Sequence, residues 1–145
     1  MAVKYGKGAK GKAIKLHSLV VRTRSEFKCD RCGVERGADR VNPRTKKVTK
    51  VSIQCAHIIT RIQLATVTDE RNAFSLCASC HWYFGKWPIE FALFMIEKHG
   101  SFDIYNALKD KVECGYVPDW DEEIERLTVL LEKYEAANRL SGEGA

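Results

Sequence analysis

Two C-x-x-C pairs, Cys29/Cys32 and Cys77/Cys80, constrain the fold of this chain most strongly. The turn within such a pair brings both sulfur atoms to one side, so two pairs supply the four thiolates of a tetrahedral zinc site. The intervening stretch, residues 33–76, is longer than in the common four-cysteine pattern, and a β-hairpin fits into it. In a chain with a modest core, such a site contributes folding free energy directly. The sequence therefore predicts a structural zinc ion held by the four cysteines.

Other features favour metal binding over disulfide bonds. The first residues, MAVKYGKGAKGK, are polar and do not form a hydrophobic signal segment, and no run of about 18 apolar residues is present. We therefore predict a cytoplasmic protein without a membrane span, in which thiols stay reduced. Of the two remaining cysteines, Cys55 is an alternative zinc ligand, and Cys114, in a predicted helix, is expected to be a core thiol.

Charge is distributed unevenly along the chain, whose formal net charge is +5. Residues 1–28 carry eight Lys or Arg and one Glu, whereas residues 117–145 carry three Lys or Arg and eight Asp or Glu. A basic front followed by an acidic end favours contact between the front and a polyanion such as DNA. We expect residues 1–16 to form a flexible basic arm. The alternative is a solvated, disordered terminus without a partner. The two interpretations are compatible if the arm is disordered when free and becomes ordered on nucleic acid.

The pattern of apolar residues predicts a mixed α+β fold. The run LVV within residues 18–28 is β-prone, and VTKVSIQCAHII at 48–59 supplies one or both strands of a hairpin. Residues 60–74 are expected to be a loop leading into a helix that begins near Asn72 or at the second cysteine pair. Capping residues and apolar spacing predict further helices at 88–100, 101–115 and 119–140.

His81 directly follows Cys80, and this adjacency indicates a second site. Successive helical side chains point about 100° apart. If Cys80 faces the zinc ion, His81 therefore faces elsewhere, with His57 and Asn72 as its candidate partners. Each residue has an alternative role. His57 is otherwise a structural histidine, Asn72 a helix N-cap, and His81 the fourth ligand of a zinc site with three cysteines.

The order C-x-x-C, then AHI, then Asn72, then LC-x-x-CH resembles the zinc-bearing branch of the HNH endonucleases, the ββα-metal type. CAHIITR and RNAFSLCASCHWYFGKWPIEF are also similar to the lambda NinG-type recombination nucleases. The resemblance covers roughly residues 29–100. It implies an α+β fold with a small ββα-metal core, a four-cysteine zinc site and C-terminal helices. The expected division is a zinc-bearing nuclease domain at 17–100 and a helical extension with an acidic tail at 101–145.

The resemblance also implies a function, metal-dependent hydrolysis of DNA phosphodiester bonds in phage or prophage recombination or processing. In this family His57 would activate water, and Asn72 would hold the loop between strand and helix. His81 would bind a catalytic Mg²⁺ or Mn²⁺ that stabilises charge on the phosphate. The products would carry 5′-phosphate and 3′-hydroxyl ends. If the chain is phage-encoded, its compartment is the bacterial host cytoplasm.

One position departs from the family pattern. Many members carry Asp or His directly before the base histidine as a metal ligand, and this chain carries Ala56. Cys55, Asp69, Glu70, water or substrate phosphate would then complete the metal shell. The rival interpretation is a non-catalytic, zinc-stabilised module that binds nucleic acid.

Several side chains are candidates for contacts with DNA or a partner. Basic residues near the motifs are predicted to bind phosphate, although any single one has an ordinary surface charge as its alternative: Arg22, Arg24, Lys28, Arg31, Arg61, Arg71 and Lys86. The aromatic run at 82–87 suits base stacking, but core packing is favoured. The apolar stripe within 119–140 indicates core packing, a partner surface or a homodimer formed through the C-terminal helices.

Overall fold

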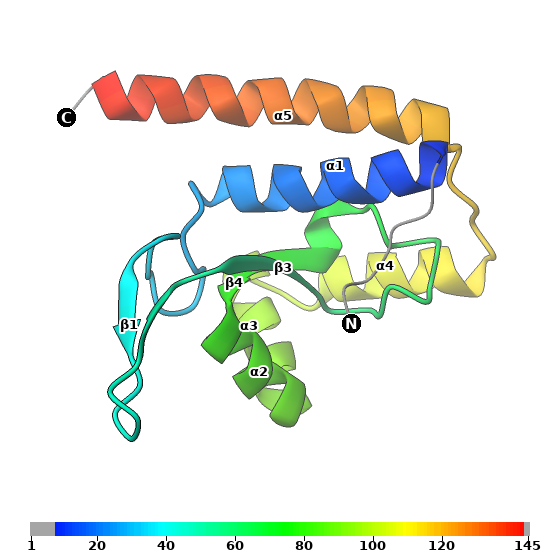
Figure 1. Ribbon diagram of the computed structural model, residues 1–145. Coiled ribbons are helices and arrows are strands. Elements are labelled where there is room, and N and C mark those ends of the chain that lie inside the picture. Colours follow the sequence, from blue (N-terminus) through cyan, green and yellow to red (C-terminus); the bar gives the residue numbers. More distant parts are fainter. Residues whose placement is uncertain (1–7, 144–145) are drawn as a thin grey trace.

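The computed structural model describes residues 8–143 of the chain (Figure 1). The elements in chain order are α1 (Ala9–Arg24), β1 (Asp39–Val41), β2 (Val48–Lys50), β3 (Ile53–His57), the 3₁₀ turn η1 (Glu70–Asn72), β4 (Ala73–Cys77), α2 (Ala78–Lys86), α3 (Pro88–His99), α4 (Asp103–Glu113) and α5 (Trp120–Glu143). This mixture of small two-stranded sheets and helices confirms the predicted α+β class, including a ββα core and C-terminal helices.

The ββα unit consists of β3, β4 and α2. Strands β3 and β4 pair antiparallel, with Ile53 opposite Cys77 and His57 opposite Ala73. Every residue of β4 is buried, because α1 lies on one side of this hairpin and the α2–α3 pair on the other (Figure 1). The expectation that residues 60–74 form a loop running directly into a helix is therefore wrong at its end. Residues 73–77 are a strand, and the helix begins at Ala78, within the second cysteine pair.

Aromatic side chains form much of the core below this hairpin. The Phe74 ring lies 5.1 Å from that of Phe94, and Phe84 stacks on Phe91 at 4.8 Å. Met95, 1% exposed, packs against the same cluster. Pro88 begins α3, and Gly100 ends it with a left-handed φ of 79°, as the sequence predicts.

The aromatic run at 82–87 divides between core and surface. Phe84 is buried, and Tyr83 packs against the core. Trp82 and Trp87 are 68% and 50% exposed, with the Lys86 ammonium over both rings. Core packing, the favoured explanation of the run, is thus wrong for the two tryptophans, because much of each side chain is open to solvent.

The N-terminal segment differs most from the expectation. Residues 9–16, expected to be part of a flexible arm, and the LVV run, expected to be β-prone, form the single helix α1. Ala13, His17, Val20 and Val21 are wholly buried, and their spacing places them on one helical face. This burial between α5 and the β3–β4 hairpin outweighs the strand preference of two adjacent valines. Residues 1–7 of the expected arm lie outside the described residues.

Helix α5 lies alongside α1 and runs in the same direction (Figure 1). Leu127 of its apolar stripe is fully buried, and Asn138 Nδ2 donates to the Thr23 carbonyl at 2.9 Å. Leu127 is therefore covered within one chain, whereas the other residues of the stripe are half-buried: Ile124, Leu130, Leu131 and Tyr134. Cys114, expected to be a core thiol, is instead exposed at the end of α4. Among the described helices, none combines the length and apolar character needed to cross a bilayer.

Candidate metal centre and nuclease site

The four predicted zinc ligands come together in one cluster. Their sulfur atoms all lie within 4.8 Å of one another, although the two C-x-x-C pairs are far apart in the chain. Cys29 and Cys32 occupy a tight turn that is closed by a hydrogen bond from Gly33 N to Cys29 O. Gly33 adopts a left-handed φ of 78° at this turn. Cys77 ends β4, and Cys80 lies in the first turn of α2. Four thiols at this spacing match the donor set of a structural zinc site.

Two arginines surround these sulfur atoms. Arg31 donates to Cys80 Sγ at 3.5 Å, and Arg40, from β1, donates to Cys77 Sγ at 3.7 Å. Burial alone would raise the pKa of Cys77, but hydrogen bonds from the Cys80 backbone and from Arg40 lower it to about 7. Burial raises the pKa of Cys80 to about 12, against the opposing effect of Arg31. Arg40 was not among the sequence candidates, and its long-range contact shows that the exposed β1–β2 hairpin folds back onto the cysteine cluster.

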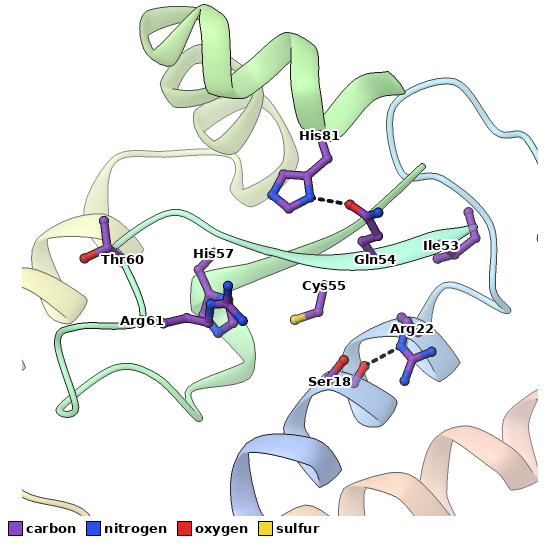
Figure 2. Close-up of a pocket in the computed structure, with 9 residues that line it drawn as sticks. All are labelled: Ser18, Arg22, Ile53, Gln54, Cys55, His57, Thr60, Arg61 and His81. Atoms are coloured by element: carbon purple, nitrogen blue, oxygen red, sulfur yellow. Dashed lines mark hydrogen bonds between the residues drawn. The ribbon is translucent and has the colours of Figure 1, made fainter. Parts of the chain in front are cut away.

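A separate cavity of about 480 Å³ lies beside β3, between α1 and α2 (Figure 2). Its lining includes His57 and His81 together with Arg22, Gln54, Cys55 and Arg61. Cys80 and His81 therefore face different sites, as their adjacency on the helix predicts. The alternative in which His81 replaces a cysteine at the zinc site is not supported by this geometry.

His57 is held in one orientation by the loop after β3. Its Nε2 lies 3.0 Å from the carbonyl oxygen of Val67. Because a carbonyl only accepts hydrogen bonds, Nε2 carries the proton and Nδ1 keeps its lone pair. Burial lowers the pKa of His57 to about 4, and the positive charge of Arg61 contributes in the same direction. The imidazole is therefore neutral at pH 7 and able to accept a proton.

His81 reaches the same cavity from α2. Its Nδ1 lies 2.6 Å from Gln54 Oε1, the side-chain amide oxygen of a β3 residue (Figure 2). With that oxygen as acceptor, Nδ1 is protonated and Nε2 is available as a metal ligand. Burial lowers the pKa of His81, and Arg61 adds to the shift, so this nitrogen stays unprotonated at neutral pH.

Asn72 fixes the loop that carries the His57 acceptor. The side chain is fully buried at the end of η1. Its Oδ1 accepts from Ile59 N at 2.8 Å, and its Nδ2 donates to Ile59 O and Thr66 O at 3.0 and 3.1 Å. The amide thus ties both ends of the 59–66 segment to the start of β4, directly before Val67.

Replacing Asn72 with alanine is expected to lower the free energy of unfolding by about 1–3 kcal/mol, because buried backbone groups of the loop lose their partners. We also expect the His57 ring to lose its fixed orientation, since the same loop carries its Val67 acceptor. Urea denaturation measures the first effect, and the NMR signals of the His57 ring measure the second. The matched control is Asn106→Ala, at an exposed position on α4. Equal effects of the two substitutions would contradict the role of Asn72 in holding the loop.

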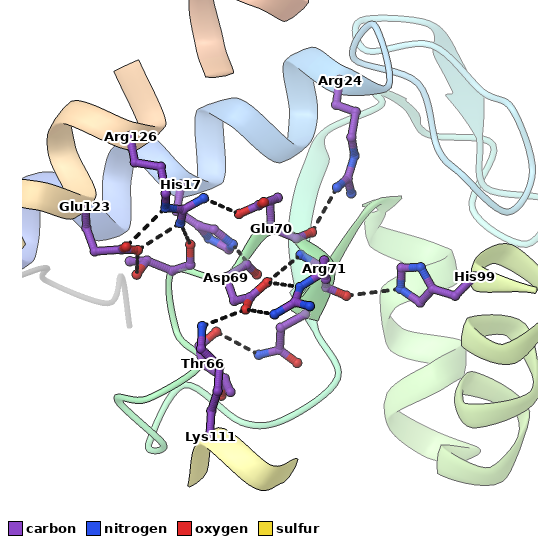
Figure 3. A network of polar contacts seen from close by, with 12 residues as sticks. His17, Arg24, Thr66, Asp69, Glu70, Arg71, His99, Lys111, Glu123 and Arg126 are labelled. Carbon is purple, nitrogen blue, oxygen red and sulfur yellow. Dashed lines mark hydrogen bonds and ion pairs between the residues drawn. The ribbon is translucent and has the colours of Figure 1, made fainter. Parts of the chain in front are cut away.

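A network of charged groups occupies the far side of this loop (Figure 3). Asp69 pairs with Arg71 at 2.7 Å and with Lys111 at 2.9 Å, and Glu70 pairs with Arg126 at 2.6 Å. Although burial alone would raise the pKa of Asp69, hydrogen bonds from Arg71 and Lys111 hold it well below its usual range. Asp69 and Glu70, considered as ligands of the catalytic metal, instead join η1 to α4 and α5.

The predicted phosphate-binding residues fall into different environments. Arg22 and Arg61 line the histidine cavity. Arg24 donates to the carbonyls of Glu70 and Ala73, both at 2.8 Å. Arg71 pairs with Asp69, so both arginines bind groups within the chain. The others lie elsewhere: Arg31 at the cysteine cluster and over the Tyr83 ring, Lys28 near Glu26 and Glu35, and Lys86 between Trp82 and Trp87.

His17 was missed by sequence reasoning, since no motif surrounds it. The structure places its ring 5.2 Å from that of His57, with Nε2 3.1 Å from the Asp69 carbonyl oxygen. Burial, reinforced by His57, lowers the pKa of His17 to about 3. Cys55, considered as an alternative ligand at the four-cysteine site, lies beside these two histidines instead. The only sequence signal for His17 was its helical spacing from Ala13 and Val21.

A comparison with protein families supports the likeness suggested by the motifs. The family described as HNH endonuclease matches residues 29–89, a range that includes the four clustered cysteines, His57, Asn72 and His81. No curated protein and no solved structure gives a significant match. Over residues 29–89, this chain is therefore similar to the HNH endonucleases.

Proposed function

We propose that the protein is a metal-dependent endonuclease that hydrolyses DNA phosphodiester bonds, with His57 as the general base. The observation that carries this proposal is the orientation of His57, whose Nε2 is bound to Val67 O in a cavity shared with His81. A neutral imidazole with a fixed tautomer is what proton abstraction from water requires. The match to HNH endonucleases over this region supports the same reaction class.

The reaction assigns one task to each residue. His57 Nδ1 takes a proton from the attacking water, and the water oxygen forms a bond to phosphorus. The bond from phosphorus to the 3′ oxygen breaks, and that oxygen leaves with the bonding electron pair and takes a proton from solvent water. His81 would hold a divalent cation, Mg²⁺ or Mn²⁺, which when bound supplies a Lewis acid for the charge on the phosphate. Ala56 points into the core, fully buried, so water and substrate oxygens complete the shell. Asn72 positions the loop that orients His57.

Arg22 and Arg61 are the proposed phosphate contacts nearest the reaction, because both line the cavity. Lys28, Arg31 and Lys86 would contact a bound duplex further from the reaction, through charge rather than sequence recognition. The product ends test the chemistry directly. Attack that breaks the bond to the 3′ oxygen leaves 5′-phosphate and 3′-hydroxyl ends, which DNA ligase rejoins without further treatment. Products that ligase cannot rejoin would contradict this direction of cleavage.

The cleavage rate is expected to be nearly independent of pH between about 5.5 and 8 as far as His57 is concerned. Its pKa is lowered from 6.5 to about 4, so the base remains neutral throughout this range. An unshifted histidine would lose half its active form at its pKa and about tenfold per pH unit below it. Single-turnover rates at saturating DNA measure this profile, with zinc content and circular dichroism checked at each pH. A tenfold loss per unit below pH 6.5 in intact protein would contradict it.

A zinc-stabilised module that binds nucleic acid without cutting it is the second candidate, favoured by Ala56 at the family's ligand position. DNA binding without cleavage of plasmid, branched or single-stranded substrates, in Mg²⁺ and in Mn²⁺, would favour that function. A place in phage recombination or DNA processing, a cytoplasmic location and a homodimer through α5 stay predictions from the sequence. Light scattering at working concentration tests the last of these.

A further inference from the structure

A second group of metal-binding side chains lies behind the wall of the histidine cavity. The side chains of His17, Cys55 and His57 each offer one ligand atom, and these atoms all lie within 4.8 Å of one another. His17 comes from α1, outside the segment that matches the HNH endonucleases, and the group shares no residue with the four-cysteine cluster. It is therefore distinct from the structural zinc site.

The hydrogen bonds of the two imidazoles leave one nitrogen of each ring available as a metal ligand. His17 Nε2 lies 3.1 Å from Asp69 O, and His57 Nε2 lies 3.0 Å from Val67 O. Both acceptors are backbone carbonyls, so both Nε2 atoms carry protons and both Nδ1 atoms present lone pairs. Metal-ligating histidines usually donate their second N–H to such an acceptor, which fixes the ring orientation.

The third donor, the Cys55 thiol, lies beside the two imidazoles. Cys55 Sγ is 4.0 Å from His17 Nδ1, and Figure 2 shows the sulfur directed toward the His57 side of the cavity. His17 is fully buried, whereas Cys55 and His57 line the cavity, so an ion can enter from that side. Ligand–metal distances of about 2.0–2.3 Å require only a modest closing of the three side chains.

Two imidazoles and one thiolate form a donor set for a borderline or soft divalent cation. Zn²⁺ and Co²⁺ accept such ligands in tetrahedral sites, whereas Mg²⁺ prefers oxygen ligands in octahedral geometry. The fourth position would open to the cavity. Binding replaces the thiol proton of Cys55, which is released to solvent, and no oxidation or reduction is involved.

We propose that His17, Cys55 and His57 form a second zinc-type site, and that its occupation switches off cleavage by taking up the Nδ1 lone pair of His57. The binding half stands on the geometry alone, whereas the inhibitory half rests on the proposed function of His57. Mg²⁺ does not compete for this donor set. Mg²⁺ would therefore support cleavage, whereas Zn²⁺ or Co²⁺ at this second site would stop it.

Metal stoichiometry tests the binding half without reference to cleavage. The full-length protein, stripped of metal under reducing conditions, is titrated with Zn²⁺ against a chromophoric chelator and with Co²⁺ by absorption. Wild type is expected to bind two equivalents, with Co²⁺ giving separate spectra for a four-sulfur and a one-sulfur site. Cys55→Ala and His17→Gln are expected to bind one, and Cys114→Ala, at an exposed thiol, two. One equivalent in wild type, or two in either site variant, would overturn the proposal.

Cleavage assays then test the inhibitory half. In Mg²⁺, the second equivalent of Zn²⁺ is expected to lower the wild-type cleavage rate at least tenfold and to leave Cys55→Ala unaffected. Equal inhibition of both proteins would overturn the inhibitory half. If no cleavage occurs under any condition, the nuclease proposal fails, while the stoichiometry still decides whether the second site exists.

Discussion

Substitution of His57 by alanine is expected to lower the single-turnover rate of DNA cleavage by about 10²–10⁴-fold, the usual contribution of a positioned general base. The substitution removes an imidazole that the Val67 carbonyl holds in one orientation. The pKa of this imidazole, at about 4, keeps it neutral and able to accept a proton. DNA affinity should change little, because phosphate contacts come from arginines. Rates are measured in excess enzyme, and affinity by fluorescence anisotropy in the absence of divalent cation.

The matched control for this substitution is His99→Ala. His99 donates to the Arg71 carbonyl at 3.1 Å and packs on Phe74, away from the cavity. His99→Ala therefore removes an imidazole from a structural position. The cleavage rate of the folded fraction should stay within a few-fold of the wild-type rate. A His57→Ala protein that is folded, zinc-loaded and still cuts at the wild-type rate would contradict the assignment of the base.

Loss of the structural zinc is expected to have the largest effect on stability. Structural zinc sites contribute about 10–16 kcal/mol of apparent binding free energy in small domains. In this chain the four cysteines join the turn at residues 29–32 to the β4–α2 junction. Cys77→Ser, or prolonged treatment with a strong chelator, should therefore abolish cooperative unfolding of the ββα core. Thermal and urea denaturation followed by circular dichroism measure the effect.

Cys114→Ser is the matched control for the cysteine substitution, because the Cys114 thiol is exposed and donates to the Lys111 carbonyl at 3.4 Å. It should leave both zinc content and the unfolding midpoint unchanged. A Cys77→Ser protein with a wild-type midpoint and no bound zinc would show that the core of Phe74, Phe84 and Met95 suffices without metal.

The parts of the fold that could be predicted from sequence are those with short-range signals. The C-x-x-C spacing identifies the cysteine cluster, and the adjacency of Cys80 and His81 predicts two separate sites. Pro88 and Gly100 mark the limits of α3 because their backbone preferences act locally.

Features that depend on tertiary packing could not be predicted in this way. Helix α1 contains Gly, Lys and adjacent valines, and its burial under α5 decides its conformation. The position of His17 beside His57 follows from that packing, so no local pattern could reveal it. Likewise, Asp69 and Glu70 have the composition of metal ligands, and only their pairing with Arg71, Lys111 and Arg126 shows a structural role.

Cleavage of supercoiled plasmid tests whether the zinc-loaded fold carries a separate cleavage site that depends on a divalent cation. Wild-type protein containing one equivalent of zinc at the four cysteines is assayed with Mg²⁺, with Mn²⁺ and with EDTA added briefly enough to leave that zinc in place. Cleavage is expected with added Mg²⁺ or Mn²⁺ and is expected to stop in EDTA, with His81→Ala inactive under all three conditions. DNA binding without cleavage in either cation, or cleavage that His81→Ala retains, would contradict the account.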